Sequence, residues 1–155
     1  SLAAADAVIA DGELSGEDRQ RLSSPVFALR RTLGVPEPLQ PGEAAPDPGG
    51  PVVALAGIAG PDRFARALEA QGWRVTRLLA FRDHHRYSPA DLAACAAALR
   101  ETGAQAVLTT EKDAMRLLPL RPFPVPMASV PLTVHVDPRT DFETWLAARL
   151  REIRA

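Results

Sequence analysis

From Pro51 onward, the order of hydrophobic and polar positions predicts strands and helices in alternation. Val52 to Ala56 is a continuous apolar run, which is typical of a strand buried on both faces. Pro61 then suits the first position of a helix, because proline has no N–H to lose there. The apolar positions of this helix recur on one face, at Phe64, Ala67 and Leu68. Residues 73–81 follow as the next predicted strand.

The same alternation continues beyond residue 88. Ser88 to Asp91 is a capping box with proline at the first helical position, and it predicts a helix whose apolar face contains Leu92, Cys95, Ala96 and Leu99. A strand is expected over 106–109, and a second capping box, Thr110 to Asp113, begins a short helix that runs to Leu118. We expect Cys95 to be a core residue rather than a nucleophile.

The last predicted elements are a strand and a helix. Residues 132–136 alternate between apolar and polar, as in a half-buried strand, and a capped helix begins at Thr140. Its predicted inward stripe is Phe142, Trp145, Leu146, Leu150 and Ile153. Strands that alternate with helices in this way favour an α/β fold, in which helices flank an open, mainly parallel sheet on both faces (α/β/α).

The chain before Pro51 does not show this regular alternation of predicted strands and helices. Residues 5–10 and 25–29 read as short strands, whereas residues 34–50 show no periodicity. Of the 15 prolines, six fall between Pro36 and Pro51, and they exclude both a helix interior and a central strand. The predicted division is therefore residues 1–33, a Pro/Gly-rich linker over 34–50, and an α/β lobe over 51–155.

Composition excludes several functional classes. A single cysteine allows no internal disulfide and no C-x-x-C zinc site. A net charge of −1 gives no general attraction to nucleic acid, so no nucleic-acid partner is expected. No apolar run approaches the roughly 20 residues of a membrane helix, and the chain is expected to be soluble. Because it begins with Ser1 and not Met, we expect it to be a piece of a longer protein.

Candidate chemistry gathers in three segments that follow predicted strands: residues 57–60, 83–87 and 109–113. In open α/β sheets, ligands bind outside the carboxyl ends of the strands. The most specific of these candidates is the triplet Asp83, His84 and His85. A neighbouring carboxylate can fix the tautomer of an imidazole so that it acts as a general base. The alternative is a polar loop that caps the next helix. A metal site needs more ligands than this segment supplies, and none is expected.

The other two segments are less specific. Capping alone accounts for Thr110 and Asp113, but Lys112 is the single lysine among 18 basic residues, and an ammonium is not equivalent to a guanidinium. Lys112 is therefore either site-facing or a surface residue. Residues 57–61 are either an anion seat at a helix start or a tight turn. The sequence contains no G-x-x-x-x-G-K-[ST] motif.

Taken together, these motifs resemble the C-terminal lobe of the tetraacyldisaccharide 4'-kinases of lipid A biosynthesis. The resemblance rests on residues 53–64, on Asp-His-His-x-Tyr at 83–87 and on Thr-Thr-Glu-Lys-Asp at 109–113. Residues 5–8 are similar to the end of that family's nucleotide-binding lobe. The resemblance implies a Rossmann-like C-terminal lobe of a P-loop kinase over 51–155, with residues 1–33 as the trailing part of the P-loop lobe.

Members of this family are ATP- and Mg²⁺-dependent and phosphorylate the 4'-hydroxyl of a lipid-linked disaccharide phosphate at the cytoplasmic face of the inner membrane in Gram-negative bacteria. The resemblance implies that His84 is catalytic, with His85 the lesser candidate. It also implies other residues that line the site: Asp83, Tyr87, Thr110, Glu111 and Lys112.

The resemblance further implies that ATP, Mg²⁺ and the membrane surface are bound mainly by a part of the protein that precedes Ser1. These 155 residues alone are then expected to be inactive. The Asp-His-His triplet is also similar to a class of metal-dependent phosphoesterases, although those need further ligands and only His135 remains elsewhere. The other alternative is a non-catalytic α/β module that binds a ligand or a partner.

Overall fold

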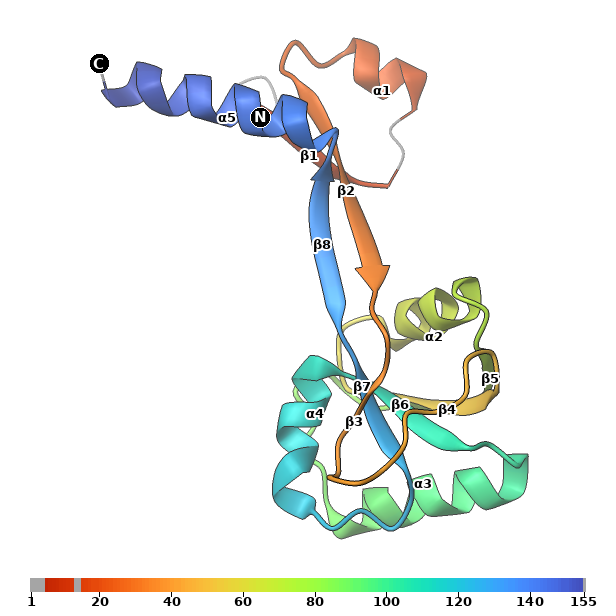
Figure 1. Cartoon of the computed structure of the whole chain (residues 1–155). Coiled ribbons are helices and arrows are strands. Elements are labelled where there is room, and N and C mark those ends of the chain that lie inside the picture. Colours follow the sequence, from red (N-terminus) through yellow and green to blue (C-terminus); the bar gives the residue numbers. More distant parts are fainter. Residues whose placement is uncertain (1–4, 13–14, 155) are drawn as a thin grey trace. The chain divides into compact units, whose positions relative to one another are not determined.

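The computed structural model describes residues 5–12 and 15–154. Its strands are β1 (Val8–Asp11), β2 (Val26–Leu33), β3 (Glu37–Pro38), β4 (Pro51–Ala56), β5 (Arg74–Ala80), β6 (Ala106–Thr110), β7 (Met127–Val130) and β8 (Leu132–Asp137) (Figure 1). Its helices are α1 (Gly16–Gln20), α2 (Pro61–Ala70), α3 (Pro89–Thr102), α4 (Glu111–Leu117), the short 3-10 helix η2 (Leu118–Leu120) and α5 (Arg139–Arg154). None of these helices combines the length and the apolar character needed to cross a membrane.

The chain divides into two compact units. The larger unit is residues 33–132, and the smaller unit combines residues 1–32 with residues 133–155. This division differs from the expected one, because the predicted linker, 34–50, is grouped with the larger unit and residues 133–155 are grouped with the N-terminal residues.

The larger unit has an α/β fold with a mainly parallel sheet, as predicted. All of residues 33–132 are described, and they form a five-stranded sheet in the order β3-β7-β6-β4-β5. The pairs β4–β5, β4–β6 and β6–β7 are parallel, and only the edge strand β3 is antiparallel to its neighbour. Between β4 and β6, Val53 is opposite Val107 and Leu55 is opposite Thr109. The carboxyl ends of β4, β5 and β6 therefore lie at one edge of the sheet.

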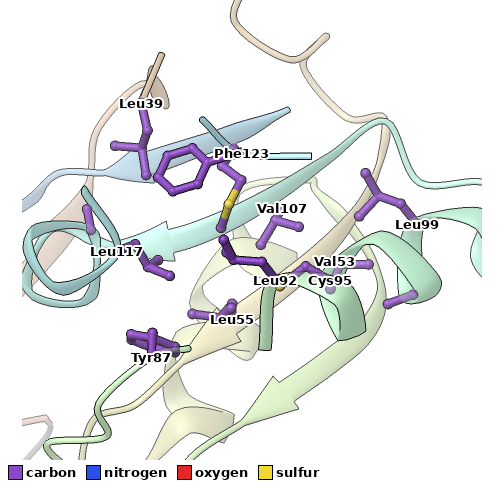
Figure 2. Close-up of a cluster of buried hydrophobic side chains, with 13 residues drawn as sticks. Leu39, Val53, Leu55, Tyr87, Leu92, Cys95, Leu99, Val107, Leu117 and Phe123 are labelled. Carbon is purple, nitrogen blue, oxygen red and sulfur yellow. The ribbon is translucent and has the colours of Figure 1, made fainter. Parts of the chain in front are cut away.

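Strand β4 is the centre of this unit because both of its faces are covered. Residues 52–56 have no exposed surface. Successive side chains of a strand point to opposite faces, so Val53 and Leu55 pack with residues of α3 and α4, including Leu92, Cys95 and Leu117 (Figure 2). The even-numbered residues of β4 pack on the other face with Phe64 and Leu68 of α2. Helices therefore lie on both faces of the sheet, as predicted.

Two strands of the larger unit were not predicted, and both lie in proline-rich segments. Strand β7 falls between Pro126 and Pro131, and all four of its residues are buried. The prolines bound this strand and do not interrupt its hydrogen bonds, which is why it can lie inside the sheet. Strand β3 ends at Pro38 and lies at the edge of the sheet, where proline is tolerated.

In the described part of the smaller unit, β1, β2 and β8 form a three-stranded sheet. The expectation that residues 132–136 extend the main sheet is therefore wrong. Helix α5 packs through Phe142 against Phe27, with ring centroids 5.1 Å apart. The predicted inward stripe is wrong beyond Trp145, since Leu146, Leu150 and Ile153 are 38%, 46% and 70% exposed. A helix of 16 residues is about 24 Å long and extends beyond the contact that Phe142 and Trp145 make with Phe27.

Cys95 provides a test of the packing of α3 against the sheet. The thiol is fully buried, and desolvation raises its pKa to about 11. The thiol is protonated below that pH, so at about pH 8 roughly one molecule in a thousand carries the reactive thiolate. We expect a disulfide reagent to react with the folded chain at least about 100-fold more slowly than with the chain in guanidinium. Equal rates in the two states would contradict the packing of Cys95.

Candidate functional site

Three loops meet at the carboxyl ends of β4, β5 and β6. The loop after β4 begins at Gly57, the loop after β5 contains residues 81–88, and β6 continues directly into α4. Two backbone contacts join the loops. The N–H of His84 donates to the carbonyl of Gly57 over 3.3 Å, and the N–H of Gly57 donates to Oδ2 of Asp113 over 2.9 Å. The three predicted candidate segments are therefore brought together.

The buried carboxylate of Asp113 joins the loops at this edge through several hydrogen bonds. Asp113 has no exposed surface. Besides Gly57, its Oδ2 accepts the hydroxyl proton of Thr110 over 2.8 Å, and its Oδ1 accepts from Nη1 of Arg116 over 3.1 Å. Buried charges are stable only when they are paired and hydrogen-bonded, and each of these partners meets that need. Asp113 thus ties the β4 loop to the start of α4.

Gly57 occupies a position that has no room for a side chain. A Cβ atom built there would lie 2.8 Å from the hydroxyl oxygen of Tyr87 and 3.1 Å from Oδ1 of Asp113. Tyr87 is buried, and desolvation together with the negative charge of Asp113 raises the pKa of its hydroxyl above the usual range. Because the N–H of Gly57 is already bonded to Asp113, it is not free to bind an anion, and the tight-turn interpretation fits this residue.

The side chain of His84 is exposed, and its backbone is strained. Its side chain is 72% exposed. Its φ of 60° lies in the left-handed region, which costs an L-residue roughly 1–2 kcal/mol. The N–H of His84 donates to Oδ1 of Asp83 over 2.9 Å, in addition to Gly57. Nδ1 of the ring lies 3.1 Å from Nη2 of Arg116, and Nε2 lies 3.6 Å from Oδ2 of Asp83.

Asp83 connects His84 to the single lysine. Nζ of Lys112 lies 3.3 Å from Oδ1 of Asp83, and both side chains are partly exposed. Desolvation raises the pKa of Asp83, but the hydrogen bond from Lys112 and the charges of His84 and Lys112 outweigh it and lower the pKa below its ordinary value. Lys112 therefore lies beside Asp83, at the loop after β5, with its side chain 48% exposed.

His85 turns away from His84 and into the protein. Its ring stacks on Phe81 with centroids 4.5 Å apart, and its Nε2 lies 3.1 Å from Oδ2 of Asp91. The same carboxylate oxygen accepts from the backbone N–H and the hydroxyl of Ser88, which completes the capping box of α3. His85 thus supports the start of a helix, which is the structural alternative considered for this loop.

The remaining predicted site residues, Thr110, Glu111 and Tyr87, make structural contacts within the protein. The hydroxyl of Thr110 caps α4 by accepting from the N–H of Asp113. Oε2 of Glu111 accepts from the backbone N–H of Leu132, so Glu111 holds the chain where it leaves β7. Tyr87 lies in the core, beside His85. The polar side chains that remain at this edge are Asp83, His84, Lys112 and the partly buried Arg116, which we call the loop-edge cluster.

Arg116 is the residue that sequence reasoning missed. It is one of 17 arginines, and nothing in its local pattern separates it from the others. The available signal is spacing, since Arg116 follows Asp113 by three residues and Lys112 by four, and residues at these intervals share a helix face.

A metal site is not formed by the described residues. No group of three or more His, Cys, Asp or Glu side chains among them is arranged to hold a metal ion. Two of the carboxylates at this edge, Asp83 and Asp113, have cationic partners in Lys112 and Arg116.

Comparison with known proteins identifies relatives of this chain. The profile of the family described as Tetraacyldisaccharide-1-P 4'-kinase (LpxK) matches residues 1–151. The tetraacyldisaccharide 4'-kinase of Bradyrhizobium sp. is 36% identical over 160 residues, which cover 99% of this chain and 46% of that protein. The enzyme of the same name from Xanthobacter autotrophicus is 40% identical over 119 residues, 75% of this chain and 33% of that protein.

A solved structure shares the fold. It is the "apo" form of LpxK from Aquifex aeolicus in complex with ATP, which matches with a TM-score of 0.52 and 19% identity over 93% of this chain and 42% of that one. The chain spans less than half the length of these relatives. With the family profile matched over nearly its whole length, the chain belongs to the tetraacyldisaccharide-1-P 4'-kinase family.

Proposed function

We propose that this chain is part of an ATP-dependent lipid kinase that phosphorylates the 4'-hydroxyl of tetraacyldisaccharide 1-phosphate in lipid A biosynthesis. Membership of the family supports this reaction. The observation that carries it is the loop-edge cluster, in which an exposed imidazole lies beside a carboxylate and two cationic side chains. Phosphoryl transfer depends mainly on a positioned nucleophile and on neutralised charge, and this cluster can provide both.

Within that function, His84 is the residue that contacts the acceptor hydroxyl. Its ring extends from the edge of the sheet and is 72% exposed, whereas the ring of His85 is 23% exposed and already engaged with Asp91. Lys112 and Arg116 supply positive charge next to His84 and suit the negatively charged groups of a phosphorylated substrate. Asp83, Tyr87, Thr110 and Glu111 hold the loops that carry these groups.

ATP and Mg²⁺ are proposed to be bound mainly by protein outside these 155 residues. The sequence contains no P-loop motif. The carboxylates of Asp83 and Asp113 do not fit Mg²⁺, because each is paired with a cation and the described residues offer no three-ligand group. Contact with the cytoplasmic face of the inner membrane of a Gram-negative bacterium is likewise proposed for the whole protein, and no nucleic acid is a proposed partner.

A transfer assay tests this function. We expect the whole protein, incubated with radiolabelled ATP, Mg²⁺ and detergent-dispersed tetraacyldisaccharide 1-phosphate, to give a labelled lipid, and we expect the 155-residue chain alone to give none. The lipid without a free 4'-hydroxyl is the matched control. The absence of labelled lipid with the whole protein would contradict the kinase and favour a non-catalytic α/β binding module. Product formed by the chain alone would contradict the proposed location of the ATP site.

A further inference from the structure

The contact between Arg116 and His84 determines which nitrogen of the ring carries a proton. A guanidinium is always charged and has only donors. Nη2 of Arg116, 3.1 Å from Nδ1 of His84, therefore requires Nδ1 to accept. In a neutral imidazole that accepts at Nδ1, the proton is on Nε2. Oδ2 of Asp83, 3.6 Å from Nε2, favours the same tautomer, because a carboxylate attracts an N–H.

We propose that Arg116 is a positioning residue that fixes His84 as the Nε2–H tautomer. His84 then offers a hydrogen-bond donor to the oxygen of the acceptor hydroxyl. The inference rests on the proposed kinase function and specifies how His84 acts in it. With Nδ1 engaged and Nε2 already protonated, His84 holds an oxygen by donating to it and does not itself remove the hydroxyl proton.

Arg116 is held in place independently of His84. Its Nη1 donates to Oδ1 of the buried Asp113 over 3.1 Å and to the carbonyl of Gly57 over 3.3 Å. The side chain of Arg116 is 24% exposed. Its Nη2 is therefore fixed before any ligand arrives, and such preorganised donors orient a site most effectively.

The backbone of His84 is fixed as well. The left-handed conformation, with φ of 60°, is kept by the hydrogen bonds from its N–H to Asp83 and to Gly57. Strained conformations persist where the surroundings over-determine them, and they cluster at functional sites. Backbone and ring of His84 are thus both held, the ring through Arg116.

The direct test reads the tautomer. In the whole protein labelled with nitrogen-15 histidine, long-range nitrogen–proton correlation spectra at about pH 8 are expected to show Nδ1 of His84 unprotonated and Nε2 protonated, with the His84→Gln variant assigning the signals. In Arg116→Lys, which keeps a positive charge beside Asp113 but cannot span both partners, we expect signals that move toward a mixture of tautomers. A protonated Nδ1 in the neutral ring of the unsubstituted protein, or spectra identical in Arg116→Lys, would overturn the proposal.

A double-mutant cycle separates positioning from a structural role. Arg116→Lys is expected to lower kcat about 10–100-fold, the usual effect of losing a group that orients a histidine. In the His84→Ala background, the same substitution is expected to change kcat by less than about twofold, since its effect passes through His84. Equal losses in both backgrounds would overturn the proposal. The matched control is Arg100→Lys, an exposed arginine of α3.

The two proposals fail in different ways. The spectra do not depend on turnover, so they report on Arg116 even if no labelled lipid forms. If the whole protein is inactive but the spectra are as expected, the kinase function fails while the assignment of the tautomer stands. If transfer occurs and the spectra show a protonated Nδ1, only the role of Arg116 fails.

Discussion

Asp113→Ala is expected to destabilise the larger unit by about 3–5 kcal/mol, the usual effect of removing one partner of a buried ion pair. The substitution leaves Arg116 without its anionic partner and leaves the N–H of Gly57 and the hydroxyl of Thr110 without their acceptor. It also removes the tie between the β4 loop and α4. Asp113→Asn keeps the shape but not the charge, and we expect an intermediate loss.

Urea unfolding followed by tryptophan fluorescence measures this effect. Trp73 is 8% exposed and belongs to the larger unit, while Trp145 belongs to the smaller one, so a Trp145→Phe background reports on the larger unit alone. Glu69→Ala removes an exposed carboxylate on α2 and serves as the control, with an expected change within about 0.5 kcal/mol. A loss below about 1 kcal/mol for Asp113→Ala would show that this carboxylate does not hold the loops.

His84→Ala is expected to reduce the kcat of the whole protein about 100-fold or more, a typical loss when one positioned hydrogen-bond donor to a reacting oxygen is removed. The reason is the position of the ring, which is exposed at the carboxyl ends of the strands and held by Arg116. The substitution removes no buried group, so we expect the unfolding midpoint to change little.

The measurement is initial rates of lipid phosphorylation at saturating ATP. His135→Ala is the matched control, because His135 is exposed on β8, outside the loop-edge cluster, and its loss is expected to leave kcat unchanged. If His84→Ala left turnover unchanged while His85→Ala abolished it, the assignment of the two histidines would be reversed.

Local patterns predicted the main part of the fold because the continuous apolar run of β4 is a clear signal of a buried strand. Five consecutive apolar residues without alternation are typical of a strand covered on both faces, and residues 52–56 are all fully buried. The alternating strand at 132–136 was assigned to the wrong sheet, because alternation reveals that one face is covered but not by which element. Strand β7 was missed because the prolines that flank it are also typical of a loop. Only its hydrogen bonds to β6 identify it as a strand.

The candidate site was predictable where residue identity carries the signal. Adjacent histidines beside an aspartate at a strand end indicated the loop, and the position of Lys112 just after another strand placed it at the same edge of the sheet. Which histidine faces outward depends on the left-handed backbone at His84 and on the stacking of His85 against Phe81, and neither is visible in a sequence. Arg116 could not be singled out among the many arginines of the sequence. What distinguishes it is the contact of its two terminal nitrogens with Asp113 and His84.

The carboxylate of Asp113 also limits how this lobe can be re-engineered. Many α/β proteins acquire new activities by exchanging one loop at a time, since each loop rests on the scaffold alone. Here the loop after β4 bonds to the start of α4, and the backbone of His84, in the loop after β5, bonds to the loop after β4. A graft of any single loop would therefore disturb its neighbours, and the three must be transplanted together as one module.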